Sequence, residues 1–315
     1  MRRLKTVLIS LLSIYFVASI AVGIALAEFT LHVHRRPVGH RSQFALVAGE
    51  QFQANLKDVS ISAKDGSVLR AWYAQPRDYN GSAVILLHGV TDKREGVAGY
   101  SRMFLQAGYR VLLPDSRAHG ESGGAIATYG LLERDDVHRW ADWVRQQPHP
   151  GCVYLFGESM GAAIALQTTA VDQSLCAVVV ESPYSTFREI AFDRFARHSR
   201  LPLWLVRPAA ELTLDSALLY SRIRYHVDLL QSSPEYCVTS NSVPLLLIAG
   251  TSDHNIPERH AKELLRIAPS HSELWEVQGA DHGGAVNVDS ARFRSKVLDF
   301  FGRHGESAGV RATNN

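Results

Sequence analysis

The chain has 315 residues, 46% of them hydrophobic and 20% charged, which is enough for a large core and excludes a disordered or collagen-like polymer. Its 33 basic and 31 acidic residues leave a formal net charge of +2. Residues 1–41 hold six of the basic residues and one acid, so the remainder has 27 basic against 30 acidic residues. This mildly acidic body argues against nucleic-acid binding, which needs a clustered positive face.

The N-terminal segment has the pattern of a membrane anchor. A short basic segment, residues 1–6, precedes an uncharged run of 21 residues from Val7 to Ala27. About 20 apolar residues cross the hydrocarbon core of a bilayer, so we interpret residues 7–27 as a single-pass signal anchor. The alternatives are a cleaved signal peptide, with Ala25-Leu26-Ala27 as its cleavage site, and a buried helix. We expect this segment to lie outside the fold, followed by a linker over residues 28–55.

The orientation of this anchor depends on the charges at its two ends. Three basic residues precede the run and three follow it closely, so the positive-inside rule discriminates only slightly between the two orientations. The α-amine favours an N-terminus on the cytoplasmic side. We therefore expect a membrane protein with the rest of the chain outside the cytoplasm.

From about residue 56 the chain alternates short strands with helices, which is typical of a mostly parallel sheet. A hairpin comes first, with strands at residues 59–61 and 68–73 around the turn Lys64-Asp65-Gly66. Apolar runs without alternation are expected of strands buried on both faces. Such runs occupy residues 83–87, 111–113, 153–156, 177–180 and 245–249.

Helical periodicity marks segments between and after these strands. Apolar residues recur at the spacing of one helix face over residues 137–144, and a final helix is predicted over residues 288–303. Residues 305–315 are predicted to be a flexible tail. Because no repeat interrupts the alternation, we expect one α/β domain over residues 56–304.

The sequence G-x-S-x-G, which can form a nucleophile elbow, occurs twice. An elbow requires a strand ending directly at the motif and a helix starting directly after it, because the serine occupies a strained turn between them. The copy at residues 157–161 has an apolar strand before it and an apolar helix after it, whereas the copy at residues 120–124 lies between loops. We therefore predict Ser159, and not Ser122, as a nucleophile.

A serine hydroxyl is a weak nucleophile and needs a base, which in turn needs an orienting acid. Around a nucleophile elbow these groups follow in the order Ser, Asp or Glu, His. Asp253 stands at the carboxyl end of a predicted strand, and His282 lies in a glycine-flanked loop after a short strand at residues 274–277. We predict the triad Ser159, Asp253 and His282. Glu181, at the end of another strand, is the alternative acid.

The oxyanion of an acyl-transfer reaction needs two preorganised N–H donors. The residue after the nucleophile supplies one of them at an elbow, so we predict the backbone N–H of Met160. The loop after the strand at residues 83–87 reads His88-Gly89-Val90, and the N–H of Val90 is the second predicted donor. We interpret His88 as a brace for that loop rather than as a proton carrier.

The remaining cysteines and histidines have a simpler interpretation. Three cysteines cannot form a disulfide framework, and we expect small buried hydrophobic side chains at Cys152, Cys176 and Cys237. His254 and His260 are interpreted as surface or helix-face residues. The sequence has no CxxC pair, HExxH, Walker A or GxGxxG motif, so we expect neither a metal site nor a cofactor.

Together these residues resemble the α/β-hydrolase superfamily, particularly its serine-aminopeptidase-like and lysophospholipase-like branch. The resemblance covers about residues 56–304. It implies an α/β-hydrolase fold, with a mostly parallel central sheet, helices on both faces and a cap insertion. The family usually has glycine where this chain has Ala118. The matching motifs are His88-Gly89, Asp115–Ser122, the elbow Gly157–Gly161, the turn at Asp253 and the loop at His282.

The regular alternation stops at residues 184–243, where related hydrolases carry a cap over the active site. The cap begins with an amphipathic helical pattern that contains more basic than acidic residues. A solvated surface and a rim that binds an anionic headgroup are both open interpretations. Aromatic residues in this segment offer surface for an acyl pocket.

These features predict a membrane-anchored serine hydrolase that cleaves carboxylic ester or thioester bonds, with a lipid-like or other acyl substrate. Its expected partners are this small-molecule substrate and, through the N-terminal helix, the membrane, but not nucleic acid. A serine peptidase or amidase of the same fold is one alternative. A catalytically inactive binding scaffold is another, because a fold alone never proves activity.

Overall fold

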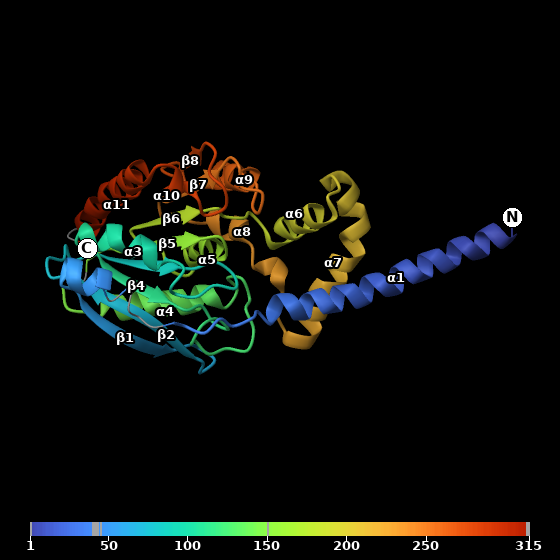
Figure 1. The fold of residues 1–315 in the computed structure, drawn as a ribbon, viewed down its shortest axis with the longest axis horizontal. Coiled ribbons are helices and arrows are strands. Elements are labelled where there is room, and N and C mark those ends of the chain that lie inside the picture. The colour runs from blue at the N-terminus through green and yellow to red at the C-terminus, as the bar shows by residue number, and fades with distance from the viewer. Residues whose placement is uncertain (1, 40–43, 45, 150, 313–315) are drawn as a thin grey trace.

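The computed structural model describes residues 2–39, 44, 46–149 and 151–312, and shows an α/β body from which one long helix projects (Figure 1). The body contains an eight-stranded sheet with the order β1-β2-β4-β3-β5-β6-β7-β8. β1 and β2 are antiparallel to their neighbours, and every other pairing is parallel. The strands are β1 Asn55–Ser62, β2 Val68–Gln75, β3 Ala83–Leu87, β4 Arg110–Pro114, β5 Val153–Glu158, β6 Ala177–Glu181, β7 Leu245–Gly250 and β8 Glu273–Val277.

Helices cover both faces of this sheet and create two hydrophobic clusters, one on each side. The central strands β3 to β7 are apolar on both faces because each side chain packs against one of the two layers. The layer on one face consists of α4 Glu133–Arg145, α5 Met160–Thr168 and α9 Arg259–Ile267. The opposite layer consists of α3 Ala98–Gln106, α10 Ala285–Val288 and α11 Ser290–Ala312.

The final helix is longer than the sequence predicted. α11 continues to Ala312, where a flexible tail was expected from residue 305, and residues 313–315 lie outside the described part. Its side chains Phe300 and Phe301 are fully buried, and the Tyr154 hydroxyl donates to the carbonyl oxygen of Phe301 at 3.0 Å. An isolated glycine such as Gly305 is tolerated inside a helix, so it does not end this one.

The insertion between β6 and β7 is a helical cap. A small hydrophobic cluster of its own holds it together, with Phe192, Val206 and Leu214 at its centre. Thr186 begins the first cap helix by accepting a hydrogen bond from the N–H of Glu189. The cap elements are α6 Phe187–Ser199, α7 Leu203–Tyr225, the 3₁₀ turn η2 Leu229–Gln231 and α8 Pro234–Val238.

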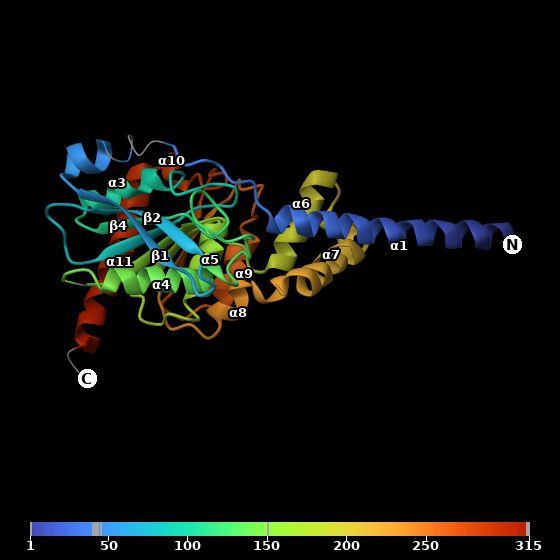
Figure 2. The same ribbon diagram turned by 90° about the horizontal axis from the view of Figure 1, so that it is seen from below.

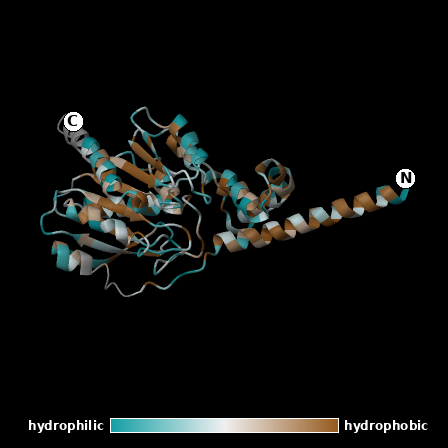
Figure 3. Cartoon of the chain, turned by 45° about the horizontal axis from the view of Figure 1, so that its top comes forward, coloured by the Kyte–Doolittle hydropathy of each residue, from teal (hydrophilic) through white to brown (hydrophobic). Residues whose placement is uncertain are grey.

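The N-terminal helix α1 Arg2–Leu31 extends beyond the predicted span at both ends and is part of the fold, contrary to our expectation. By length and composition it could cross a membrane, and a signal sequence would satisfy the same criterion. It packs against α7 (Figures 1 and 2), with Leu31 in the hydrophobic cluster of the cap. Hydropathy colouring shows hydrophobic residues along most of its length (Figure 3).

The segment predicted to be a linker also packs on the body. It includes the π-helical turn η1 Leu46–Gln51 and the first residue of β1. The Arg35 guanidinium donates to the carbonyl oxygens of Ser122 and Gly124, each at 2.6 Å. Phe44 is buried and stacks on Trp72, with ring centroids 5.4 Å apart. Tertiary contacts therefore hold the described parts of a stretch for which the sequence shows no periodic pattern, and residues 40–43 and 45 lie outside the described part.

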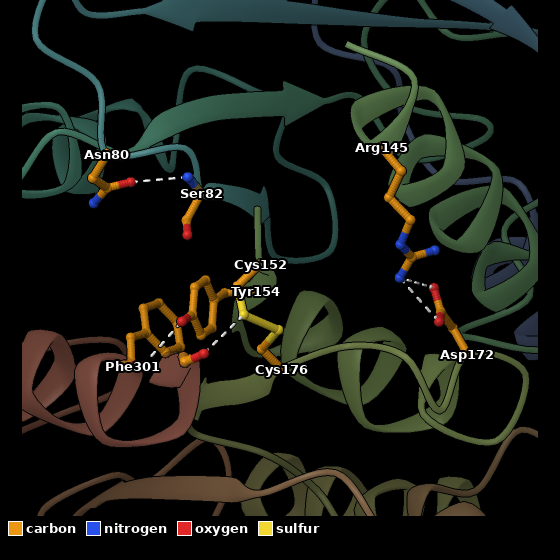
Figure 4. The surroundings of a disulfide bond; sticks show 9 residues. Asn80, Ser82, Arg145, Cys152, Tyr154, Asp172, Cys176 and Phe301 are labelled. Atoms are coloured by element: carbon orange, nitrogen blue, oxygen red, sulfur yellow. Dashed lines mark hydrogen bonds and ion pairs between the residues drawn. A yellow bond between two sulfur atoms is a disulfide. The ribbon is translucent and has the colours of Figure 1, made fainter. Parts of the chain in front are cut away.

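A disulfide joins Cys152 to Cys176, so the prediction of small buried hydrophobic side chains is wrong for these two residues (Figure 4). Each cysteine directly precedes one of the neighbouring parallel strands β5 and β6, and their Cα atoms are 5.7 Å apart. That separation is typical of disulfides. Cys237 is buried with a free thiol.

This pairing predicts one titratable thiol, that of Cys237, in the full-length protein denatured without reductant. The residues joined are 24 positions apart, so removing the bond should lower the free energy of unfolding by about 3 kcal/mol through loop entropy in the unfolded chain. Denaturant unfolding of a Cys152→Ala, Cys176→Ala double variant checks this, with Cys237→Ala as the control for the thiol count. Three titratable thiols in the wild type would contradict the disulfide.

Candidate active site

Ser159 occupies the junction between β5 and α5 in a backbone conformation that only a tightly determined turn can hold. Its φ is +57° and its ψ is −115°, in the region that side chains other than glycine rarely adopt. A Cβ at Gly157 would overlap the carbonyl of Gly161, and one at Gly161 would overlap the carbonyl of Leu87. The two motif glycines therefore let the helix start directly on the sheet, and Ser159 stands at the strand end.

The other copy of the motif has a structural role. Ser122 is fully buried, and its Oγ donates to the carbonyl oxygen of Asp115 at 2.7 Å and accepts from the N–H of Arg70 at 2.9 Å. The nearby Ala118 has a φ of +61°, which explains why glycine is usual there in the resembled family. The backbone tolerates alanine at this strain.

His282 and Asp253 meet at the same edge of the sheet. The Nδ1 atom of His282 is 2.8 Å from Oδ2 of Asp253, whose other oxygen accepts from the N–H groups of Asn255 and Ile256 at 2.8 and 2.9 Å. Burial of Asp253 opposes its ionisation, but the hydrogen bond and charge of His282 more than offset this effect and lower its pKa. An ionised Asp253 holds the imidazole with its proton on Nδ1, which leaves Nε2 free to accept a proton.

The alternative acid, Glu181, has different partners. Its Oε1 accepts from the N–H of Ala285 at 2.8 Å, and its Oε2 is 3.1 Å from the hydroxyl of Tyr100. That hydroxyl is also 3.2 Å from Oε2 of Glu158, which pairs with Glu181 in the register of β5 and β6. Burial, reinforced by the charge of Glu158, raises the pKa of Glu181 to about 7.

This carboxylate pair was not anticipated, although both residues stand at the ends of predicted neighbouring strands. One tyrosine hydroxyl has a single proton, so it can donate to only one of the two carboxyl groups. The other contact needs a protonated carboxyl, which the raised pKa values of Glu158 and Glu181 favour. Within this pair, Glu181 holds the chain just after the His282 loop by accepting a hydrogen bond from the N–H of Ala285.

The loop after β3 places its backbone beside the elbow. A Cβ built at Gly89 would lie 3.9 Å from Oγ of Ser159. His88 is buried and accepts from the N–H of Ser116 at Nε2, so its Nδ1–H donates to the carbonyl oxygen of Gly89 at 2.8 Å. His88 thus braces this loop, as predicted. Within the described part of the chain, neither Val90 nor Met160 uses its backbone N–H in a hydrogen bond.

A second Ser–His–Asp contact ties the cap to the body, and the sequence did not reveal it. Oγ of Ser185 is 2.9 Å from Nδ1 of His260, whose Nε2 is 2.8 Å from Oδ2 of Asp193 in α6. Ser185 and His260 are fully buried, so this serine cannot meet an external substrate. His260 lies on a helix face, as expected, but that face is covered by the cap. Arg259 adds a 2.7 Å ion pair to the same aspartate.

The basic residues of the cap divide into two groups. Arg188 pairs with Glu211 and Asp215, and Arg207 pairs with Glu189, so these two arginines are neutralised within the cap. Arg194 is half-buried and close enough to Asp253 for their charges to interact. Burial and the neighbouring positive charge of Arg197 lower its pKa.

The fold and the site define the class of protein to which the chain belongs. A model of the α/β hydrolase family matches residues 84–295, which are 212 of the 315 residues, so this chain is a member of that family. Among curated proteins, YqkD of Bacillus subtilis is 25% identical over 92% of this chain and 95% of its own length. Human monoglyceride lipase is 26% identical over 69% of this chain and 80% of its own length.

Solved structures support the same fold. The esterase Pf2001 of Pyrococcus furiosus superposes with a TM-score of 0.68 at 24% identity, covering 88% of this chain and 98% of that one. An esterase from Exiguobacterium antarcticum superposes with a TM-score of 0.57 at 18% identity, covering 78% of this chain and 99% of that one. At these identities the likeness concerns the fold alone.

The geometry predicts different consequences for the two candidate acids. Asp253→Asn should lower kcat by about 10⁴, because an amide at this position favours the wrong imidazole tautomer. Glu181→Gln should stay within about tenfold of wild type, because its amide oxygen can still accept from Ala285 and does not touch the imidazole. Steady-state kinetics with an ester substrate checks both variants. A large loss in Glu181→Gln alone would move the acid to β6.

The raised pKa of Glu181 predicts a fall in stability as pH rises. Below its ordinary value of 4.5 the carboxyl is protonated in both states, and between 4.5 and about 7 only the unfolded chain releases the proton. The free energy of unfolding should therefore fall by about 3 kcal/mol as the pH rises from 4.5 to about 7, and it should remain at the lower value above pH 7. Denaturant unfolding of Glu181→Gln should lack most of this fall, whereas the exposed control Glu50→Gln should retain it. Identical pH profiles for wild type and Glu181→Gln would contradict this prediction.

Proposed function

We propose that this α/β hydrolase is a membrane-anchored serine hydrolase that cleaves carboxylic ester bonds of lipid-like acyl substrates through an acyl-enzyme. The observation that carries the proposal is the 2.8 Å contact between Nδ1 of His282 and Oδ2 of Asp253, at the sheet edge where Ser159 occupies its elbow. The N–H groups of Val90 and Met160, which make no hydrogen bond in the described part of the chain, are the donors that we assign to the oxyanion.

In the first half of the reaction, Oγ of Ser159 attacks the acyl carbonyl carbon while Nε2 of His282 takes the hydroxyl proton. The carbonyl electron pair moves to oxygen, and the N–H groups of Val90 and Met160 stabilise the resulting oxyanion. Asp253 stabilises the imidazolium. Collapse of the tetrahedral intermediate breaks the ester bond, and the imidazolium gives its proton to the departing alkoxide. The acyl group stays on Ser159.

In the second half, a water molecule replaces the alcohol. His282 removes a proton from this water as the oxygen attacks the acyl carbon, and the same two N–H groups stabilise the second oxyanion. Collapse releases the carboxylic acid and returns the proton to Oγ of Ser159. The free enzyme is regenerated without any redox change.

Two observations support an ester of a lipid-like acyl group over other substrates. A relative is named monoglyceride lipase and two structural neighbours are named esterases. The cap over the site has an apolar cluster of its own and exposes the aromatic side chains of Trp204 and Tyr236. An anchored enzyme would also meet membrane-soluble substrates at raised local concentration.

The location of the body outside the cytoplasm is part of the same proposal. α1 has the length and composition of a membrane span, and its N-terminal end carries Arg2, Arg3 and Lys5. Disulfides persist in oxidising compartments and are rare in the cytosol. The bond between Cys152 and Cys176 therefore supports a body on the non-cytoplasmic side.

Ser159→Ala should abolish labelling by a fluorophosphonate probe and lower kcat by about 10⁶, because the attacking oxygen is removed. Ser122→Ala is the matched control from the other copy of the motif and should remain labelled. Gel detection of the probe and ester kinetics on the full-length protein check both variants. Persistent activity and labelling of Ser159→Ala would refute the proposed function, and loss in Ser122→Ala alone would transfer the role to that serine.

The acyl preference tests the substrate class. Each methylene buried in an acyl pocket contributes about 0.8 kcal/mol, or about fourfold in kcat/KM when fully buried. We expect kcat/KM for p-nitrophenyl esters to rise from acetate to at least octanoate, with Ser159→Ala as the background control. A preference for acetate would indicate a small-pocket esterase. Efficient cleavage of aminoacyl amides with poor ester turnover would indicate a peptidase instead.

A further inference from the structure

The end of the cap that lies along the projecting helix has the features of a lipid-binding surface. We define the cap tip as residues 194–207, which comprise the end of α6, the turn after it and the start of α7. We propose that the cap tip is seated in the headgroup layer of the bilayer that α1 crosses. This inference rests on the membrane anchor of the proposed function and adds a second lipid contact to it.

The first step is that α1 and the cap form one packed unit. The buried residues of α1 are Ser19, Gly23, Ala27 and Leu31, which are four positions apart and therefore share one helix face. A Cβ at Gly23 would lie 2.5 Å from the carbonyl oxygen of Thr213, so only glycine permits this approach of the two helices.

Polar contacts at both ends of the seam hold the same arrangement. The Glu28 carboxylate accepts from the hydroxyls of Tyr220 and Tyr225, each at 2.6 Å. Towards the free end of α1, the Tyr15 hydroxyl donates to the carbonyl oxygen of Ala209 at 3.1 Å. Because the seam is closed along its length, the depth of α1 in a membrane also sets the depth of α7.

The second step is a comparison of lengths. In α1, residues 2–18 are exposed and burial against the cap begins at Ser19. The exposed and uncharged part, from Val7 to Ala18, has 12 residues and is therefore about 18 Å long. The hydrocarbon core of a bilayer is about 30 Å thick, and tilting the helix only increases the length required. The rest of the span must lie beside the cap, which brings the cap into contact with the bilayer.

The third step is the composition of the cap tip, which suits this position. Trp204 is 71% exposed, Leu201 51% and Leu205 41%, so apolar side chains point outward where water would otherwise surround them. Tryptophan is enriched at the level of lipid headgroups. The segment between Asp193 and Glu211 contains no acidic residue and four arginines, of which Arg197 and Arg200 are exposed, whereas Arg207 is paired with Glu189. A positive surface with an apolar centre matches an anionic headgroup layer.

This placement connects the membrane to the active site through a single helix. The end of α6 belongs to the cap tip, and the residue directly before the cap tip, Asp193, contacts His260 of the body at 2.8 Å. Arg194 lies in the same helix, close enough to Asp253 for their charges to interact.

The test measures depth in vesicles of phosphatidylcholine and phosphatidylglycerol. Full-length protein with Cys237→Ala is labelled with a nitrobenzoxadiazole fluorophore at Trp204→Cys. Quenching is then read from a lipid that carries a nitroxide near its headgroup. The matched control is Tyr236→Cys in α8, which is 70% exposed but lies at the base of the cap near the sheet (Figures 1 and 2). Leu12→Cys reports insertion of α1 itself.

We expect quenching at position 204 to exceed that at position 236 by at least about threefold, with position 12 in lipid. Quenching at position 12 without quenching at position 204 would overturn the inference and leave the anchor intact. Absence of quenching at position 12 would show that α1 is not inserted in the bilayer. That result would overturn the anchor and the inference with it. Equal quenching at positions 204 and 236 would show that the whole body lies on the membrane, which also contradicts a specific seat for the cap tip.

The packing seam provides a second, independent readout. Gly23→Leu should force α1 away from α7 and lower quenching at position 204 by at least about threefold, while position 12 stays in lipid. Ala21→Leu introduces the same side chain on the exposed face of the same helix and should change neither value. Unchanged quenching at position 204 in Gly23→Leu would show that the seam does not position the cap.

Discussion

The strained backbone of Ser159 is the constraint on which the rest of the site depends. A residue with φ of +57° persists only where its surroundings determine it, and here a strand and a helix meet without an intervening loop. Gly157 and Gly161 make that junction possible because any side chain there would overlap neighbouring carbonyls. The close approach of Gly161 to Leu87 also brings the loop after β3 beside the serine. One backbone arrangement thus holds Ser159 at the strand end and the loop of Gly89 next to it.

Parallel strands gather the remaining groups at one edge of the sheet, and this creates an electrostatic problem. Glu158, Glu181 and Asp253 all stand near His282, where several ionised carboxylates would repel one another. The structure separates their states by environment. Asp253 is stabilised as an anion by the imidazole and by two backbone N–H groups, whereas burial favours the protonated form of Glu158 and Glu181. A single orienting anion therefore faces the imidazole.

The cap is held by two sets of contacts, one to the body and one to α1. It is joined to the body by the buried contact from Ser185 through His260 to Asp193, and it is joined to α1 by a seam of small residues around Gly23. A helix that reads in sequence as a detached tether therefore contributes Leu31 to the cap's hydrophobic cluster. Substitutions in α1 are accordingly expected to act on the position of the cap.

The sequence by itself determined the α/β alternation and the family, and it led to the prediction of Ser159 rather than Ser122 as the nucleophile, because each inference depends on local periodicity and on what directly flanks a motif. It also predicted that Asp253 and His282 follow strand ends, and tertiary structure brings them within 2.8 Å. The sequence did not predict contacts between segments that are distant along the chain. The disulfide of Cys152 depends on which strands are neighbours, the packing of Gly23 depends on a cap helix about 190 residues later, and the burial of His260 depends on where the cap folds back. Periodicity reports which face of an element is apolar, but only packing decides what covers that face.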